Sequence, residues 1–451
     1  MSTRFWWFGF CLISILTVHS KAFASTGETY GYGSRASALG NTMLGGIQDG
    51  YSTFYNPAAN SANSGLRLSL GVAYAKPSFL EIKDIVVGNT AVAAETGDVL
   101  GSVKNDDYLD HLGQTVGASL NFGEKWKLLT VGLTGSLPIT RLAYLDTGEA
   151  FRPEYFGYRS RTQRPQVYAS MSVSPFQNFY MGTGIAISTN LAANTTLYAT
   201  TNPGSVSYQR FSSTIKPGAA PYFSLYGTPS KLIWGVTARL PNRYTLSIDT
   251  NASARLFGTQ SGIPLVTNSA STLYYDPLEV DLGMGLHITP QTFATLEVDW
   301  FQYKKYESPT VKVVDKGSGA ALLTSISNVP TMRDIFVPKL GLELRFEKFK
   351  ARFGYAFRKS PVENNNGPGN LIDPDKHLFS LGAGIDLKEA GMVAQNLILD
   401  LHAQYHWLVR KRVTKALGNE VGTLSQSKVG APGYDIGGKI YSAGLSFSMA
   451  F

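Results

Sequence analysis

Along most of the chain, apolar side chains alternate with polar or small ones at a period of two residues. This period predicts β-strands that have one apolar face. The final segment shows it without interruption, because every second residue from Tyr441 to Phe451 is apolar and the residues between are Ser, Gly or Ala. Similar alternation occupies the stretches 280–288, 296–300, 340–346, 349–358 and 397–407.

Fourteen such segments can be counted, and their connections alternate between short and long. They start near residues 66, 114, 127, 166, 178, 219, 231, 278, 291, 336, 348, 377, 396 and 439. Short turns lie at 121–124, 174–177, 227–230 and 289–290, and long polar connections at 77–111, 138–165, 189–218, 253–277, 304–329 and 411–438. Short turns on one side and long loops on the other are typical of outer-membrane β-barrels.

Beyond the first 24 residues, no stretch reaches the eighteen apolar residues that a transmembrane helix needs. A closed barrel is the other structure that pairs every backbone group inside a bilayer. We therefore predict an all-β fold: a transmembrane antiparallel barrel of about 14 strands, over residues 66–451.

The first 24 residues have the pattern of a cleavable signal peptide. Arg4 is followed by an apolar run from Phe5 to Val18, and then by Ala22-Phe23-Ala24. The mature chain is expected to begin at Ser25 and to reside in the bacterial outer membrane. An N-terminal membrane anchor is the alternative, although fourteen residues are short for a spanning helix.

Composition narrows the chemistry. The single cysteine, Cys11, lies in the predicted signal, so the mature chain offers no thiol nucleophile and no Cys metal site. We expect no metal and no cofactor. The formal charge is +8, or +6 once Arg4 and Lys21 leave with the signal, and it is dispersed along the chain. Dispersed charge indicates solvated loops and lumen, not a nucleic-acid partner.

Residues 25–65 precede the first strand and lack its alternation. Eight strands fill their own barrel, whereas sixteen to eighteen leave an aqueous channel. A fourteen-stranded lumen therefore needs an occupant, and this segment, rich in Gly, Ala, Ser and Asn, is the expected plug. A periplasmic tail is the alternative.

Two parts of the chain resemble a known family. Gly33 to Asn41, Asp49-Gly50, and Tyr55-Asn56-Pro57-Ala58-Ala59 resemble the N-terminal hatch of the FadL/TodX outer-membrane transporters. Lys350 to Val362, followed by Pro374 to His377, resembles the strand, Ser-Pro-Val and loop order of the same family. The terminal Ala450-Phe451 is similar to the assembly signal of outer-membrane barrels.

The resemblance implies a channel for long-chain fatty acids or other hydrophobic molecules. Loops would capture the ligand, a pocket beside the hatch would hold it, and it would leave laterally through a kink in the third strand. The hatch residues that this implies for ligand binding are Phe54, Tyr55, Asn56, Pro57 and Ala58. In the third strand the candidates are Gly135, Ser136 and Pro138, since Gly marks bulges and Pro cannot donate to a ladder. An ordinary strand end explains these three equally well.

Lumen-facing charges offer partners for a ligand carboxylate. Arg345, Lys350 and Arg352 are the candidates, because guanidinium groups match a carboxylate. The alternative is that they form ion pairs with lumenal acids.

His402 and His406 beside Asp400 could suggest an esterase, but no serine can be assigned to them. We therefore expect no enzyme. The expected partners are a hydrophobic small molecule and outer-membrane lipids, with the chain a monomer. A general diffusion porin or a surface structural barrel is the alternative function.

Overall fold

The computed structural model describes most of the chain after the predicted signal. The described residues are 26–47, 49–86, 100–103, 108–123, 129–140, 153–158, 162–201, 206–255, 263–307, 312–316, 330–365, 370–415 and 433–451. The predicted signal peptide, residues 1–24, lies outside them. No helix in these ranges is both long enough and apolar enough to cross a bilayer.

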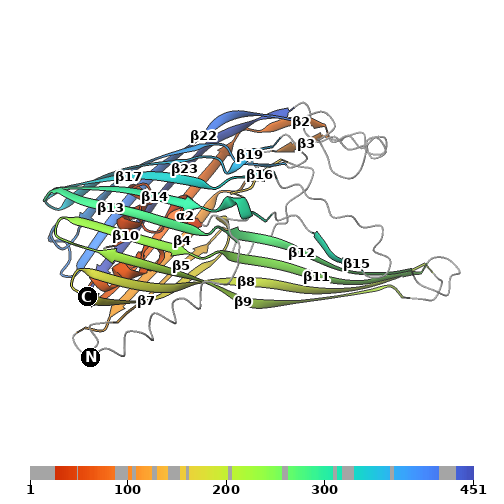
Figure 1. The fold of residues 1–451 in the computed structure, drawn as a ribbon, viewed down its shortest axis with the longest axis horizontal. Helices are drawn as coiled ribbons and strands as arrows, with labels where there is room; N and C mark the ends of the chain where they lie inside the picture. Colours follow the sequence, from red (N-terminus) through yellow and green to blue (C-terminus); the bar gives the residue numbers. More distant parts are fainter. Residues whose placement is uncertain are drawn as a thin grey trace, which may run out of the picture.

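Fourteen strands form a closed antiparallel barrel, as predicted (Figure 1). Each pairs with the next around the wall, and the last strand returns to the first. They are β1 (Leu66–Phe79), β4 (His111–Asn121), β5 (Thr130–Pro138), β7 (Gln166–Phe176), β8 (Phe179–Thr200), β9 (Tyr208–Gly227), β10 (Leu232–Arg239), β13 (Glu279–Thr289), β14 (Thr292–Phe301), β17 (Ile335–Phe346), β18 (Phe349–Arg358), β21 (Lys376–Asp386), β22 (Asn396–Thr414) and β23 (Gly433–Ala450).

The wall has the two faces that the alternation predicts. On β17, Leu340 is 52% exposed on the outer surface, whereas Glu343 is fully buried on the inner side. On β23, Tyr441, Leu445 and Phe447 point outward in the same way. The outer surface is therefore an apolar band, and the polar set lines the lumen.

Several strands extend beyond the barrel or pair outside it. The barrel sheet is continued by β11 (Asn242–Arg255), β12 (Ile263–Asp276) and β15 (Lys312–Lys316). Three separate two-stranded sheets pair β2 (Ile82–Val86) with β3 (Leu100–Val103), β6 (Glu154–Tyr155) with β20 (Leu371–Ile372), and β16 (Thr331–Met332) with β19 (Val362–Asn364). A short 3-10 helix, η6, covers Tyr303–Lys305. The prediction that residues 189–218 and 253–277 form loops was wrong over most of their length. Both stretches are rich in Ser, Thr and Asn, so their strands carry little apolar alternation.

The N-terminal segment lies inside the barrel, where the plug was predicted. It folds into α2 (Thr26–Tyr30), α3 (Ser34–Ala38), η1 (Met43–Gly46), α4 (Ser52–Tyr55) and η2 (Pro57–Ala62), here called the hatch. The hatch touches all fourteen barrel strands. Its helix α3 contacts β18, β21, β22 and β23, α4 contacts β4, β5 and β7, η1 contacts β10 and β13, and η2 contacts β8 and β9. Hydrogen bonds from Arg35, Met43 and Gly50 reach the remaining strands, β17, β14 and β1. It therefore spans the cross-section of the lumen.

Glycine allows the hatch to approach the wall this closely. A Cβ at Gly354 of β18 would overlap the backbone nitrogen of Gly40, which itself has a φ of +75°. A Cβ at Gly182 of β8 would overlap the backbone nitrogen of Ala58. Any other residue at Gly182 or Gly354 would push the hatch inward.

Buried charges hold the hatch in register. Arg35 of α3 donates through Nε to Glu343 at 3.0 Å, and Glu343 also accepts from Arg352 at 2.8 Å and from Arg345 at 2.8 Å. Arg352 in turn bonds Asp400 at 2.6 Å. Since removing one member of a buried ion pair leaves an uncompensated charge, this network ties α3 to β17.

A buried carboxyl lies at the centre of the hatch. Asp49 is 5% exposed and accepts a hydrogen bond from the backbone nitrogen of Tyr51 at 2.8 Å. Burial raises the pKa of Asp49 to about 7, although this hydrogen bond and the Arg35 charge lower it. Arg67 also faces the group and lowers its pKa, and Asp400 raises it.

The first prediction concerns pH. Because the pKa of Asp49 is raised in the folded state, the contribution of this carboxyl to the stability of the seated hatch is fully present below about pH 4 and is lost as the pH rises to about 7. Amide hydrogen exchange of residues 43–55, corrected for its chemical pH dependence, should be slower at pH 5 than at pH 8. Asp49→Asn should remove the difference. An equal pH effect in both proteins would show that another group titrates.

The second prediction concerns the outer face. Leu340→Arg should destabilise the barrel in bilayers by about 2–4 kcal/mol, since a cation near the midplane on the lipid side is poorly solvated. Leu340→Met, which keeps an apolar side chain, is the matched control. Equilibrium unfolding in lipid vesicles measures both, and equal stability of the two variants would contradict the assigned face.

Candidate functional site

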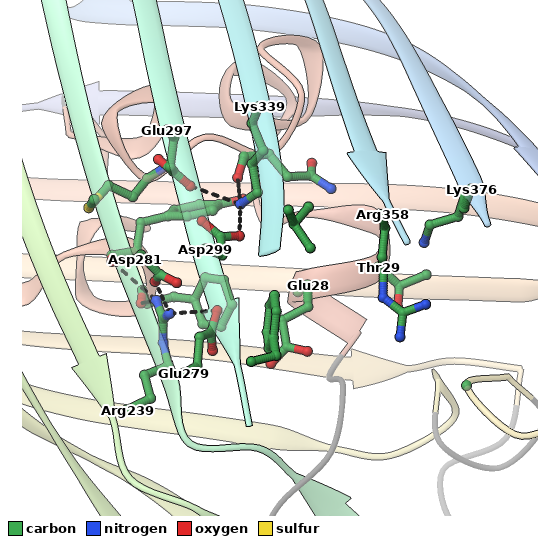
Figure 2. A pocket seen from close by; sticks show the side chains of 18 of the residues that line it. Glu28, Thr29, Arg239, Glu279, Asp281, Glu297, Asp299, Lys339, Arg358 and Lys376 are labelled. Atoms are coloured by element: carbon green, nitrogen blue, oxygen red, sulfur yellow. Dashed lines mark hydrogen bonds and ion pairs between the residues drawn. The ribbon is translucent and has the colours of Figure 1, made fainter. Parts of the chain in front are cut away.

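A cavity of about 60 Å³ lies between the hatch and the inner wall (Figure 2). From the hatch it is lined by Glu28, Thr29, Phe54 and Tyr55, among others. The wall contributes strands β10, β13, β14, β17, β18 and β21. Its lining combines aromatic side chains with an unusual number of charges.

One side of the cavity is acidic, because alternate residues of two neighbouring strands point inward. Glu279 and Asp281 lie on β13, and Asp281 pairs directly with Asp299 of β14. Arg239 of β10 bonds Glu279 at 3.0 Å and also bonds Asp281. On the other flank, Lys339 of β17 bonds Asp299 at 2.6 Å and Glu297 at 2.8 Å. Four carboxylates thus share two bases.

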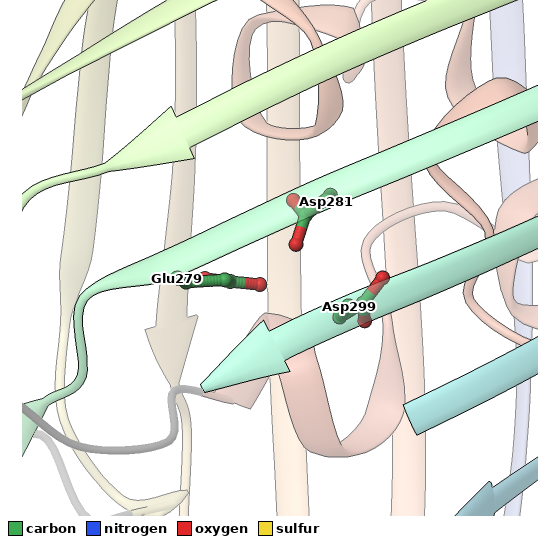
Figure 3. A group of neighbouring side chains, drawn as sticks. All are labelled: Glu279, Asp281 and Asp299. Atoms are coloured by element: carbon green, nitrogen blue, oxygen red, sulfur yellow. The ribbon is translucent and has the colours of Figure 1, made fainter. Parts of the chain in front are cut away.

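Three of these carboxylates lie close enough together to hold a metal ion (Figure 3). Among the described residues they are Glu279, Asp281 and Asp299, whose ligand oxygens lie within 4.8 Å of one another. One oxygen each of Asp281 and Asp299 has no hydrogen-bond partner. Arg239 and Lys339 already supply opposing charge, so the arrangement also works as an ion-pair network without a metal.

The opposite side of the cavity is basic. Arg358 of β18 bonds Asp373 and donates to the Tyr303 hydroxyl at 3.2 Å. Lys376 of β21 is 8% exposed and lines the same cavity, and it makes no ion pair or hydrogen bond with any described side chain. Figure 2 shows both bases on the side of Thr29, away from the acids of β13 and β14, with Glu28 of the hatch between the two groups. A buried, unpaired ammonium is costly unless a ligand supplies its counter-charge.

The hatch places two aromatic rings at the cavity. Phe54 packs under the Arg239 guanidinium at 5.0 Å, and its backbone oxygen accepts from Arg239 at 2.7 Å. Tyr55 donates its hydroxyl to the Tyr32 backbone oxygen at 3.1 Å. Burial raises the pKa of Tyr55, and it raises the pKa of Tyr303 to about 12. Both phenols therefore remain neutral at physiological pH.

The five predicted hatch residues divide into two groups. Phe54 and Tyr55 line the cavity. Asn56, Pro57 and Ala58 are not in its lining and lie against the wall. There Asn56 donates to the Leu225 backbone oxygen at 3.0 Å, and the Ala58 nitrogen donates to Ser224 at 2.8 Å. A ligand-binding role for these three stays a prediction.

The predicted carboxylate partners lie elsewhere in the lumen. Arg352 bonds Glu343 and Asp400, Arg345 bonds Glu343, and Lys350 is half-buried beside them. None of the three lines the central cavity. The bases that do, including Arg358 and Lys376, were missed, because alternation gives the face of a residue but not its partners across the barrel.

The lateral-opening candidates lie on β5. Its ladder runs from Thr130 to Pro138 against β4 and from Thr130 to Ser136 against β7, with no register shift. Gly135 belongs to the outward set, and a Cβ added there would meet only the Gln166 backbone oxygen, at 3.5 Å. Pro138 lies opposite Gly113, beyond the last β7 pair. An opening here stays a prediction.

The residues that suggested an esterase do not form a triad. His402 Nδ1 lies 2.9 Å from Ser34 Oγ, but Asp400 bonds Arg352, and both Ser34 and His402 are buried. His406 bonds Gln404 at 3.3 Å. His402 thus joins the wall to the hatch, whereas His406 bonds a neighbour on its own strand.

Comparison with known proteins supports the fold. No family model matches the chain, and no curated protein sequence matches it. Among solved structures, a Pseudomonas aeruginosa FadL homologue is 12% identical with a TM-score of 0.63, covering 96% of this chain and 100% of its own. The Ralstonia pickettii toluene transporter TbuX is 12% identical with a TM-score of 0.52, covering 94% and 99%.

A third structure, the CymD monoaromatic hydrocarbon channel, is 12% identical with a TM-score of 0.50 and covers 93% of this chain and 97% of its own. At such identities the likeness is one of fold. The resemblance predicted from the hatch motifs is therefore confirmed at that level, and the chain has the barrel fold of the FadL-type channels.

Proposed function

We propose that this protein is an outer-membrane channel for the uptake of hydrophobic small molecules. The observation that carries the proposal is the hatch, which touches every barrel strand and has a small cavity beside its aromatic residues. A general diffusion porin needs an open aqueous lumen, whereas here the plug fills it. TbuX and CymD, which share the fold, are described as a toluene transporter and a monoaromatic hydrocarbon channel.

The seated hatch corresponds to a closed state. A cavity of about 60 Å³ is well below the roughly 150 Å³ of an apolar cavity that holds one benzene molecule. A hydrophobic ligand must therefore displace part of the hatch to pass. The charged anchors around Glu343 and the titrating Asp49 are the contacts that such a movement would have to disturb.

Long-chain fatty acids are the ligand class that we favour over plain hydrocarbons. A toluene site needs no charge, but this cavity holds an unpaired Lys376 beside Arg358, at the edge of Phe301, Tyr303 and Val337. An ammonium and a guanidinium suit a carboxylate head group, and the apolar side chains suit the start of its chain. The ligand would leave through the barrel wall, and the candidate residues from the sequence are Gly135, Ser136 and Pro138.

The third prediction tests the plug. Deleting residues 27–60 should convert a low-conductance barrel into an open pore and abolish saturable uptake of labelled palmitate. Planar-bilayer conductance and uptake into vesicles are the two measurements. If the intact protein already conducts like a wide porin and the deletion changes neither quantity, the porin function is correct.

The fourth prediction tests the head-group site. Lys376→Met should weaken palmitate binding by about tenfold or more, since a hydrogen bond to a charged group contributes about 1.5–3 kcal/mol. Binding of toluene should not change. The matched control is Lys350→Met, which removes a half-buried lumenal lysine outside the cavity. Loss of binding in the control alone would place the head group at Lys350.

A further inference from the structure

A hollow lies on the outer surface of the wall, where β21, β22, β23 and β1 adjoin. Its volume is about 620 Å³, within the roughly 300–1,000 Å³ of sites that bind small molecules. Its floor is formed by two small side chains, because Ala403 of β22 pairs with Ala443 of β23. In the same row of the sheet, Leu381 pairs with Ala403 on one side and Tyr74 with Ala443 on the other. Two large, exposed side chains thus border two methyl groups.

Aromatic rings border the hollow toward one end of the barrel. The next row of outward residues contains Phe379, Tyr405 and Tyr441, which pair in that order across β21, β22 and β23. The ring centres of Tyr405 and Tyr441 are 5.4 Å apart. One row farther, His377 and Trp407 stack at 5.3 Å. Outward aromatic rows mark the boundary between hydrocarbon and water on such barrels, so the hollow lies on the hydrocarbon side of this boundary.

The direction of the strands assigns the hollow to one leaflet. Tyr441 pairs with Lys76, close to the end of β1 from which the chain continues to β2. Figure 1 shows β2 and the C-terminus at opposite ends of the molecule. The end of the barrel that carries the long connections is the extracellular one, and the short turns are periplasmic. The hollow and its aromatic rows therefore face the outer leaflet.

Two lysines lie directly above the hollow. Lys76 of β1 pairs with Tyr441, and Lys439 of β23 pairs with both Ser78 and Trp407. The two lysines are therefore diagonal neighbours, a relation in which Cα atoms are about 7–8 Å apart. Both are exposed, and the Lys439 ammonium lies 5.5 Å from the centre of the Tyr441 ring. Neither forms an ion pair or a hydrogen bond with a described residue.

The acids at this rim already have partners. Asp435 of β23 bonds Arg410 at 2.7 Å and Arg412 at 3.4 Å, so one carboxylate is shared by two exposed arginines of β22. Asp110 accepts a hydrogen bond from the Tyr74 hydroxyl. The two lysines therefore present positive charge immediately above an apolar hollow.

We propose that this hollow binds one acyl chain of a phosphorylated glycolipid of the outer leaflet, and that Lys76 and Lys439 hold one of its phosphates. The site lies outside the lumen, so it goes beyond the proposed channel function.

Position and charge together select this occupant. The hollow is continuous with the lipid-facing surface, which favours an acyl chain. An ammonium binds phosphate as a point charge, and the long lysine side chain lets its methylene groups lie on apolar surface while the charge stays at the interface. A second copy of this chain is a poorer occupant, because a symmetric contact would bring the same lysines of both copies together.

The experiment is native mass spectrometry of the purified mature protein in detergent micelles, with bis-phosphorylated lipid A added. The protein should retain one lipid A. Replacing both lysines (Lys76→Met with Lys439→Met) should weaken this binding by about tenfold or more, from the contribution of each base to an anionic lipid surface. The matched control is Lys231→Met with Lys348→Met, which removes two exposed lysines from short turns at the other end of the barrel and should leave binding unchanged.

A second pair of variants tests the hollow itself. Ala403→Trp fills it and should abolish the complex with lipid A. Ala294→Trp, on the outward set of β14 with Leu296, adds the same ring elsewhere on the wall and should have no effect. If Ala403→Trp does not fold, the two lysine pairs decide alone.

Lipid A without its phosphates should bind equally to the unchanged protein and to the Lys76/Lys439 variant. Equal binding of lipid A and phosphatidylglycerol by the unchanged protein, or equal loss in both lysine pairs, overturns the glycolipid site. A dimer that Ala403→Trp dissociates, with no change in bound lipid, also overturns it and identifies a second copy as the occupant.

Discussion

The requirement that every backbone group be paired inside a bilayer is the constraint from which the rest of this structure follows. It demands a closed sheet. Fourteen strands close a sheet whose interior is too wide for the wall residues alone to fill, so the chain must bring its own filling. The hatch meets that demand by contacting each strand, and glycines such as Gly182 and Gly354 let its backbone lie directly on the wall. The need to seal the lumen thus follows from the number of strands in the barrel.

A sealed lumen raises a second problem, because polar wall residues lose their water. Ion pairs shared between wall residues and the hatch replace the lost hydration. Glu343 accepts from three arginines, one of them from the hatch, so a single carboxylate both stabilises the wall and seats the plug. At the central cavity the balance is incomplete, with acids in excess beside β13 and an unpaired Lys376 opposite. An uncompensated charge in a buried site favours the binding of a ligand that carries the opposite charge.

Strand alternation was sufficient to predict the barrel, its strand number and its plug, because the apolar period reports directly on which face meets lipid. It was not sufficient for β11 and β12, where Ser, Thr and Asn residues interrupt the apolar alternation. It also did not single out the bases that line the central cavity. Arg352 and Lys376 have the same inward setting in sequence, and only the structure shows that Arg352 forms ion pairs with Glu343 and Asp400 whereas Lys376 forms none with a described side chain.

The strands beyond the barrel show how a closed sheet can be extended while its strands stay paired. β9 pairs with β10 from Gly227 to Tyr222, and farther out β11 pairs in parallel with β8, so the strands are paired at both levels. Pro221 of β9 and Pro241 between β10 and β11 lie where the pairing changes, and proline has no N–H that would need a partner there. The irregular backbone is thus confined to the crossing, and the ladder of a strand such as β5 stays continuous with both neighbours.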